Sequence, residues 1–223
     1  MEYLALIVIL GGLGAMAFFL TKSGKDTDKK RAELAAGKGW NYTPFNSTLV
    51  LNIPETERNI SYRLDGITAD GTVWHMVSRY QKSIETSART KLILNPSAEW
   101  LAEKSFNGHF LVMLHQGITL PDFIMTEIFK KLEFPVDTPR LEDRALPAEL
   151  SKRYAVYCDN PEDLDFIAAA TPHLDNWTRK YPGNEKALIF TGSPTGFKMR
   201  TDFDMGKETD MEFFVNTGLS IIG

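Results

Sequence analysis

The chain has a single cysteine, Cys158, among its 223 residues. One cysteine excludes an intramolecular disulfide and is typical of a reducing compartment. Basic residues do not predominate either, since 25 lysines and arginines stand against 29 aspartates and glutamates, which gives a formal net charge of −4. Apart from a cluster at residues 22–31, the sequence has no basic run that could neutralise phosphates. We therefore predict no nucleic-acid partner.

Histidine is scarce, and its spacing does not suit a metal site. The sequence contains no HExxH or CxxC motif. His109 and His115 would lie about 20 Å apart on one straight strand. That is too far for two ligands that must each approach a metal to about 2 Å. The remaining histidines are His75 and His173, and no glycine-rich segment matches a nucleotide-binding fingerprint. We predict neither a metal ion nor a cofactor.

The residues that could act as nucleophiles, acids or bases are each explained by a structural role. Residues 192–196 are not a G-x-S-x-G elbow, because Ser193 directly follows the first glycine, so we predict a hairpin turn. Cys158 precedes a helix N-terminus that could lower its thiol pKa, but a lone cysteine in an apolar strand is more typical of a core. Acidic groups at predicted helix starts stabilise exposed N–H groups; they are Glu162, Asp163, Asp165, Glu208, Asp210 and Glu212. We predict no catalytic residues.

What the sequence does contain is a long apolar run at its start. Residues 3–20 carry no charged side chain. About 20 apolar residues cross the hydrocarbon layer of a bilayer, so residues 1–20 are predicted to form a transmembrane helix. Ala15-Met16-Ala17 resembles a signal-peptidase site, but no basic residue precedes the run and it continues to Leu20. A retained anchor is therefore favoured over a cleaved signal.

Basic residues follow this run on its C-terminal side. They are Lys22, Lys25, Lys29, Lys30 and Arg31. Lysine and arginine near a membrane helix stay on the cytoplasmic side. This predicts an inner-membrane protein with its N-terminus outside and its C-terminal domain in the cytoplasm. The same residues could contact anionic lipid headgroups, each adding about 1 kcal/mol near the surface.

Small residues gather on one face of the predicted membrane helix. Gly11 and Ala15 are four residues apart, and Gly14 lies beside them. Small side chains allow another helix to approach closely, although glycine and alanine are also common in membrane helices generally. We predict that this face packs against another membrane protein subunit, in addition to the contact of the helix with the lipid bilayer.

The remainder divides into a polar basic linker, residues 21–31, and one soluble α+β domain, residues 32–223. Strands are expected as pairs over 60–80, with turns at Asp65-Gly66 and Asp70-Gly71, and at 90–94, 110–114, 154–158, 186–191 and 197–202. Helices are expected at 31–36, 97–104, 121–132, 160–170, 171–177 and 207–220. Short strands, tight turns and clustered helices favour a mainly antiparallel sheet. The four tryptophans, Trp40, Trp74, Trp100 and Trp177, would fill its core or line a ligand pocket.

A short helix and a Gly-Trp-x-Tyr-like stretch open this domain, at residues 34–42 (LAAGKGWNY). With residues 120–123 (LPDF) and the strand-to-helix stretch 153–169, this layout resembles a family of uncharacterised bacterial membrane proteins. The resemblance implies an N-terminal anchor and a cytoplasmic α+β domain. It supplies no catalytic residues.

Three hypotheses about function remain. The first is a single-pass inner-membrane accessory, scaffolding or assembly subunit of a larger membrane complex, which acts by binding rather than catalysis. The second is a membrane-tethered sensor that binds a small ligand or lipid in the soluble domain. The third is an enzyme whose site is built from residues that are distant in sequence.

Overall fold

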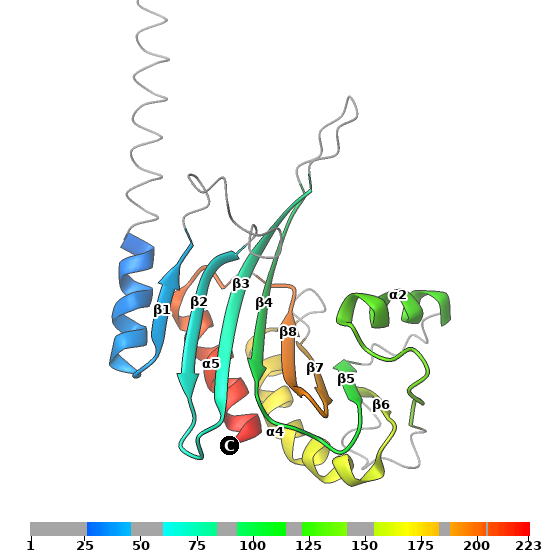
Figure 1. Ribbon diagram of the computed structural model, residues 1–223. Helices are drawn as coiled ribbons and strands as arrows, with labels where there is room; N and C mark the ends of the chain where they lie inside the picture. Colours follow the sequence, from blue (N-terminus) through cyan, green and yellow to red (C-terminus); the bar gives the residue numbers. More distant parts are fainter. Residues whose placement is uncertain are drawn as a thin grey trace, which may run out of the picture.

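An eight-stranded antiparallel sheet forms the centre of the domain (Figure 1). The computed structural model describes residues 26–45, 60–83, 93–114, 122–141, 154–182, 188–203 and 205–223. In spatial order the strands are β1 (Asn41–Pro44), β2 (Ile60–Ile67), β3 (Val73–Ser83), β4 (Ile93–Ala102), β8 (Gly196–Thr201), β7 (Leu188–Ser193), β5 (Phe110–Leu114) and β6 (Tyr154–Cys158). The predicted α+β class with an antiparallel sheet is confirmed.

Helices pack against both faces of the sheet. The described helices are a segment over residues 26–37, α2 (Asp122–Leu132), the short 3-10 helix η2 (Pro161–Asp163), α4 (Leu164–Lys180) and α5 (Glu208–Ile222). Residues of α4 and α5 share the main core with the inner face of the sheet. Phe129 of α2 packs on the opposite face, where it meets Leu111 of β5 and Tyr157 of β6. The rest of that opposite face, over β2, β3, β4 and β8, is called the open face below.

Three tryptophans lie at the centre of the main core. Trp74, Trp100 and Trp177 are at most 1% exposed, which confirms that they fill a core. The rings of Trp74 and Trp100 stack with centroids 5.8 Å apart on neighbouring strands. Trp40 is half-buried and meets Trp74 edge-on at 5.7 Å. Alternate residues of each strand face this core, as the two-residue period of a strand requires.

The structure corrects the prediction at residues 93–104. Asn95-Pro96 was expected to end a strand and Ser97 to begin a helix, but β4 runs through both to Ala102. Pro96 pairs with Tyr80 on β3, whereas β8 pairs with β4 only from Ala98 onward. Proline has no N–H to donate and is tolerated where one side of a strand needs no partner.

Two further local signals give structures that differ from the predicted ones. The predicted turn at Asp65-Gly66 is wrong, because both residues lie in β2. Gly66 instead leaves room for an indole, since a Cβ there would collide with the ring of Trp74. The two helices predicted at 160–170 and 171–177 are not separated at Pro172: after the short η2, one helix, α4, runs through Pro172 to Lys180. Proline usually breaks a helix, but the ring of Pro172 is exposed while the buried face of α4 continues past it.

Other elements agree with the sequence predictions. The turn at Asp70-Gly71 has the positive φ of 91° that favours glycine, and the β7–β8 hairpin turns at residues 194–195. The second half of the predicted linker, residues 26–31, is instead helical, so the first described helix begins at residue 26 and not at the predicted residue 31. No helix among the described residues is long and apolar enough to cross a membrane. The predicted anchor, with Gly11, Gly14 and Ala15, lies outside the described residues, as do Lys22 and Lys25.

Candidate functional site

The candidate nucleophile Cys158 has no activated thiol. Its side chain is 3% exposed in the main core, and its Sγ donates to the backbone oxygen of Asn160 at 2.9 Å. Burial raises the pKa of the thiol, which opposes formation of the thiolate that reacts as a nucleophile. The predicted role as a small core residue is confirmed.

Several predicted helix-start carboxylates connect elements that are distant in sequence. Asp163 is buried and accepts hydrogen bonds from the backbone N–H groups of Asn107 and Gly108. Asp210 accepts from the hydroxyl of Tyr181 at 2.5 Å, and Glu212 forms an ion pair with Lys38 at 2.7 Å. In the part of the chain that the structure describes, no group of three or more histidine, cysteine or acidic residues could hold a metal ion. The contacts of Asp163, Asp210 and Glu212 join separate elements of the domain.

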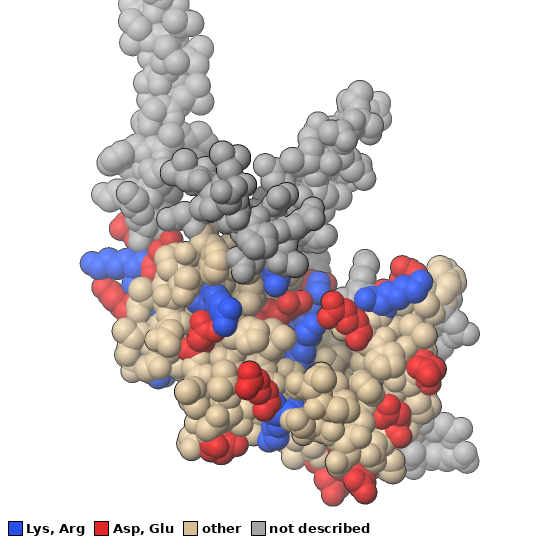
Figure 2. All heavy atoms as spheres, in the orientation of Figure 1, with Lys and Arg blue, Asp and Glu red and all other residues tan. Residues whose placement is uncertain are grey.

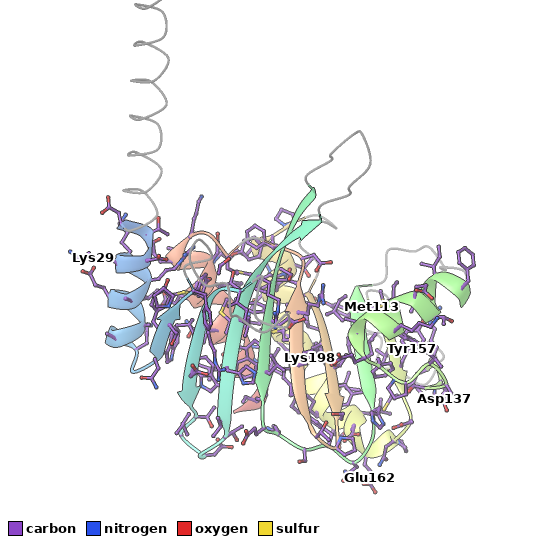
Figure 3. All side chains as sticks on the ribbon, turned by 45° about the horizontal axis from the view of Figure 1, so that its top comes forward. Lys29, Met113, Asp137, Tyr157, Glu162 and Lys198 are labelled. Atoms are coloured by element: carbon purple, nitrogen blue, oxygen red, sulfur yellow. The ribbon has the colours of Figure 1, made fainter. Side chains whose placement is uncertain are left out.

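A cleft of about 330 Å³ lies at the border between the open face and α2. Its sheet side is formed by residues of β3, β4, β7 and β8, including His75, Leu101, Thr191 and Lys198. The loop after β4 contributes Glu103 and His109, and the end of α2 contributes Leu132, Glu133 and Phe134. Acidic and basic side chains are mixed across this side of the molecule (Figure 2). Lys198 lies on β8, at the side of the open face that is nearer to α2 (Figure 3).

The end of α2 places one carboxylate at this cleft. The backbone of Glu133 has a φ of 56°, a left-handed conformation that favours glycine. The next N–H, that of Phe134, then donates to the carbonyl of Phe129 at 2.9 Å and ends the helix. A Cβ in this conformation costs about 1 kcal/mol. The turn nevertheless places a Glu133 oxygen 3.7 Å from Lys198 Nζ.

Two other ionisable groups of the cleft lie on or beside β3. His75 is half-buried, and burial lowers the pKa of its imidazole, an effect strengthened by the positive charge of Arg63. The ring is therefore neutral at pH 7 and offers one hydrogen-bond donor and one acceptor. Glu103 is exposed, and its backbone N–H donates to the carbonyl of Val73 at 2.9 Å. This bond holds the residue beside the start of β3.

Of the basic residues predicted to contact lipid headgroups, Arg31 differs from Lys29 and Lys30 in its exposure to solvent. Lys29 and Lys30 are exposed, and Lys29 lies 3.7 Å from Glu33. Arg31 points into the domain instead, with a side chain only 12% exposed. It donates to the backbone oxygens of Met205 and Gly206 at 3.3 and 2.7 Å, and its guanidinium carbon lies 4.4 Å from the ring centroid of Tyr62. Arg31 thus attaches the helix over residues 26–37 to the domain.

Replacing Arg31 with alanine should destabilise the domain by about 1.5 kcal/mol, because hydrogen bonds from a charged donor are lost. The alanine variant of exposed Lys30 should change stability by less than about 0.5 kcal/mol. Urea unfolding followed by tryptophan fluorescence measures both in the full-length protein, since all four tryptophans lie between residues 40 and 177. Equal effects of the two substitutions would contradict the attachment.

The cleft was not predicted from the sequence. Its ionisable residues are separated by up to 123 positions, from His75 to Lys198, and none belongs to a short motif. The sole local signal of the cleft was Glu133. It directly follows Leu132, the last apolar residue of α2, at a position where glycine commonly ends a helix. Comparisons with protein-family models, curated proteins and solved structures found no match to this chain.

Proposed function

We propose that this protein is a single-pass protein of a bacterial inner membrane whose α+β domain acts by binding, as an accessory, scaffolding or assembly subunit of a larger membrane complex. The attached helix over residues 26–37 carries the proposal. Ala35 of this helix is fully buried, and Asp28 accepts from the Tyr42 hydroxyl at 2.8 Å. The helix is therefore part of the domain and not a tether to it.

This attachment leaves a short connection to the predicted anchor. Five residues separate Leu20 from Asp26, and an extended chain spans at most about 3.5 Å per residue. The domain would then lie within about 20 Å of the end of the membrane helix. A short connection raises the effective concentration of the domain at a partner in the same membrane. Such confinement suits a subunit that binds a membrane complex.

Capture of the full-length protein in mild detergent tests this proposal. The wild type is expected to co-purify with other membrane subunits, with Gly11, Gly14 and Ala15 in contact with a partner helix. The double variant Gly11→Leu, Ala15→Leu should recover at least tenfold less partner, because leucine prevents close approach. The matched control, Ile9→Leu with Met16→Leu, changes the opposite helix face and should recover as much as the wild type. A wild type that migrates alone as a monomer would refute the proposal.

The cleft favours a second function, a membrane-tethered sensor. Its volume of about 330 Å³ is at the lower end of the range for small-molecule sites. It combines an apolar floor with a few polar groups, as such sites do. A panel of metabolites should contain a compound that raises the melting temperature of the full-length protein, and Leu101→Trp, which fills the cleft, should abolish that rise. A rise that survives Leu101→Trp would place the ligand elsewhere.

A further inference from the structure

We propose that the cleft binds a small ligand with a primary ammonium group on a short apolar body, and that Glu103 is the counter-ion of that group. This inference rests on the sensor function proposed above. It follows from three properties of the cleft: its uncompensated charge, its hydrogen-bond acceptors and its apolar floor.

The charges of the cleft leave one carboxylate uncompensated. Lys198 is its sole lysine or arginine among the described residues, and this ammonium lies beside Glu133 at 3.7 Å. His109 faces Asp159, with Nδ1 3.2 Å from Oδ2. Glu103, which lines the cleft, has no side-chain hydrogen bond or ion pair within the described part of the chain. A ligand with one positive charge would balance it, whereas an anion would meet two carboxylates.

Basic groups elsewhere on the open face already have acidic neighbours. Arg63 lies 2.5 Å from Asp65 on the same strand. Arg200 lies 3.2 Å from Glu99 and 3.1 Å from Asp202. These pairs reduce the positive potential that would otherwise attract an anion to this face. The selectivity of the cleft for a cation therefore depends on Glu103.

The polar groups of the cleft suit an ammonium group with three donors. Glu103 supplies carboxylate oxygens, and Thr191 supplies a hydroxyl. The neutral imidazole of half-buried His75 supplies a ring nitrogen, since an uncharged imidazole can accept one hydrogen bond. A quaternary ammonium would not use these acceptors, because it has no N–H to donate.

The apolar residues of the cleft limit the rest of the ligand. Leu132 and Phe134, at the end of α2, are 8% and 6% exposed and belong to the small core beneath that helix. Leu101 of β4 adds an aliphatic side chain from the opposite side. These residues provide a floor for one short aliphatic or aromatic group, whose binding is favoured because apolar surface is removed from water.

Phenethylamine is a suitable probe, with 2-phenylethanol and 3-phenylpropionate as neutral and anionic analogues. Calorimetric titrations use full-length protein in lipid nanodiscs. Phenethylamine should bind at least tenfold more tightly than either analogue, and Glu103→Gln should remove that advantage. The control Glu162→Gln changes an exposed acid outside the cleft (Figure 3) and should bind as the wild type does. Comparing variants in identical nanodiscs separates binding from partition into lipid.

Each result of this experiment is decisive. Equal affinities for the three probes, no binding of phenethylamine, or an unchanged Glu103→Gln variant would overturn the ammonium proposal. The sensor function is judged separately, by whether any metabolite gives a melting shift that Leu101→Trp abolishes. Urea unfolding of Glu103→Gln confirms that the variant is folded, since replacing an exposed carboxylate should leave the unfolding midpoint close to that of the wild type.

Discussion

Replacing Asp163 with alanine is expected to destabilise the domain by about 3 kcal/mol. Its carboxylate is 4% exposed and accepts from the backbone N–H of Gly108 at 2.9 Å and of Asn107 at 3.3 Å. A hydrogen bond to a charged group contributes about 1.5–3 kcal/mol, and alanine would leave the buried Gly108 donor without an acceptor. Urea unfolding of the full-length protein, followed by tryptophan fluorescence, measures the loss.

Two further variants test whether the loss of stability is specific to the Asp163 carboxylate. Glu162→Ala removes the neighbouring exposed carboxylate and should cost less than about 1 kcal/mol, the usual effect of an acid in a first helical turn. Asp163→Asn keeps one oxygen acceptor and should give an intermediate loss. The loop that Asp163 holds also carries Glu103 and His109 to the cleft, so Asp163→Ala should weaken phenethylamine binding as well. Equal stability of the two alanine variants would refute this role.

Replacing Gly218 with alanine, which adds one methyl group, is expected to destabilise the domain by about 2 kcal/mol. Gly218 lies on the buried face of α5, where a Cβ would lie 2.6 Å from Trp100 Cδ2. Alanine normally stabilises a helix interior by about 1 kcal/mol relative to glycine. Here that gain is outweighed, because overpacking a core usually costs about 1–3 kcal/mol, and Trp100 is held between Trp74 and Phe197.

The matched control for this prediction lies two residues further along the same helix. Ser220 is exposed, and Ser220→Ala should leave stability unchanged or slightly increased. Thermal unfolding of both variants should show a lower melting temperature for Gly218→Ala alone. If Gly218→Ala were as stable as the wild type, α5 would not lie against the indole as closely as the structure shows.

The sequence predicted elements whose signals are local. Met211, Phe214 and Val215 lie on one face of a helical period, and α5 forms where they predict it. Tyr154–Cys158 is an apolar run bounded by polar residues, and it forms β6. The failures arose where tertiary contacts override a local signal: Pro96 within β4, Gly66 beneath an indole, and Pro172 inside a helix whose opposite face is buried.

The candidate site could not be predicted from the sequence in the same way. His75, Glu103 and Lys198 meet only because β8 pairs with β4 and β4 pairs with β3. Sequence periodicity indicates which side of a strand faces a core, but it does not give the order of strands in a sheet. Arg31 shows the same limit. Its position in a basic cluster of the sequence does not indicate that its side chain donates hydrogen bonds to the carbonyl groups of Met205 and Gly206.

The position of β8 in the sheet has a consequence for biosynthesis. The β7–β8 hairpin lies between β4 and β5, so it joins the strands β1–β4 to the pair β5–β6. Translation proceeds at about 5–20 residues per second, and roughly 100 residues separate β4 from β8, so β4 waits about 5–20 s for its partner. During that time the nascent chain exposes an unpaired strand edge that can aggregate. The proposed membrane anchor, inserted early, would keep these edges at the bilayer, separate from other nascent chains.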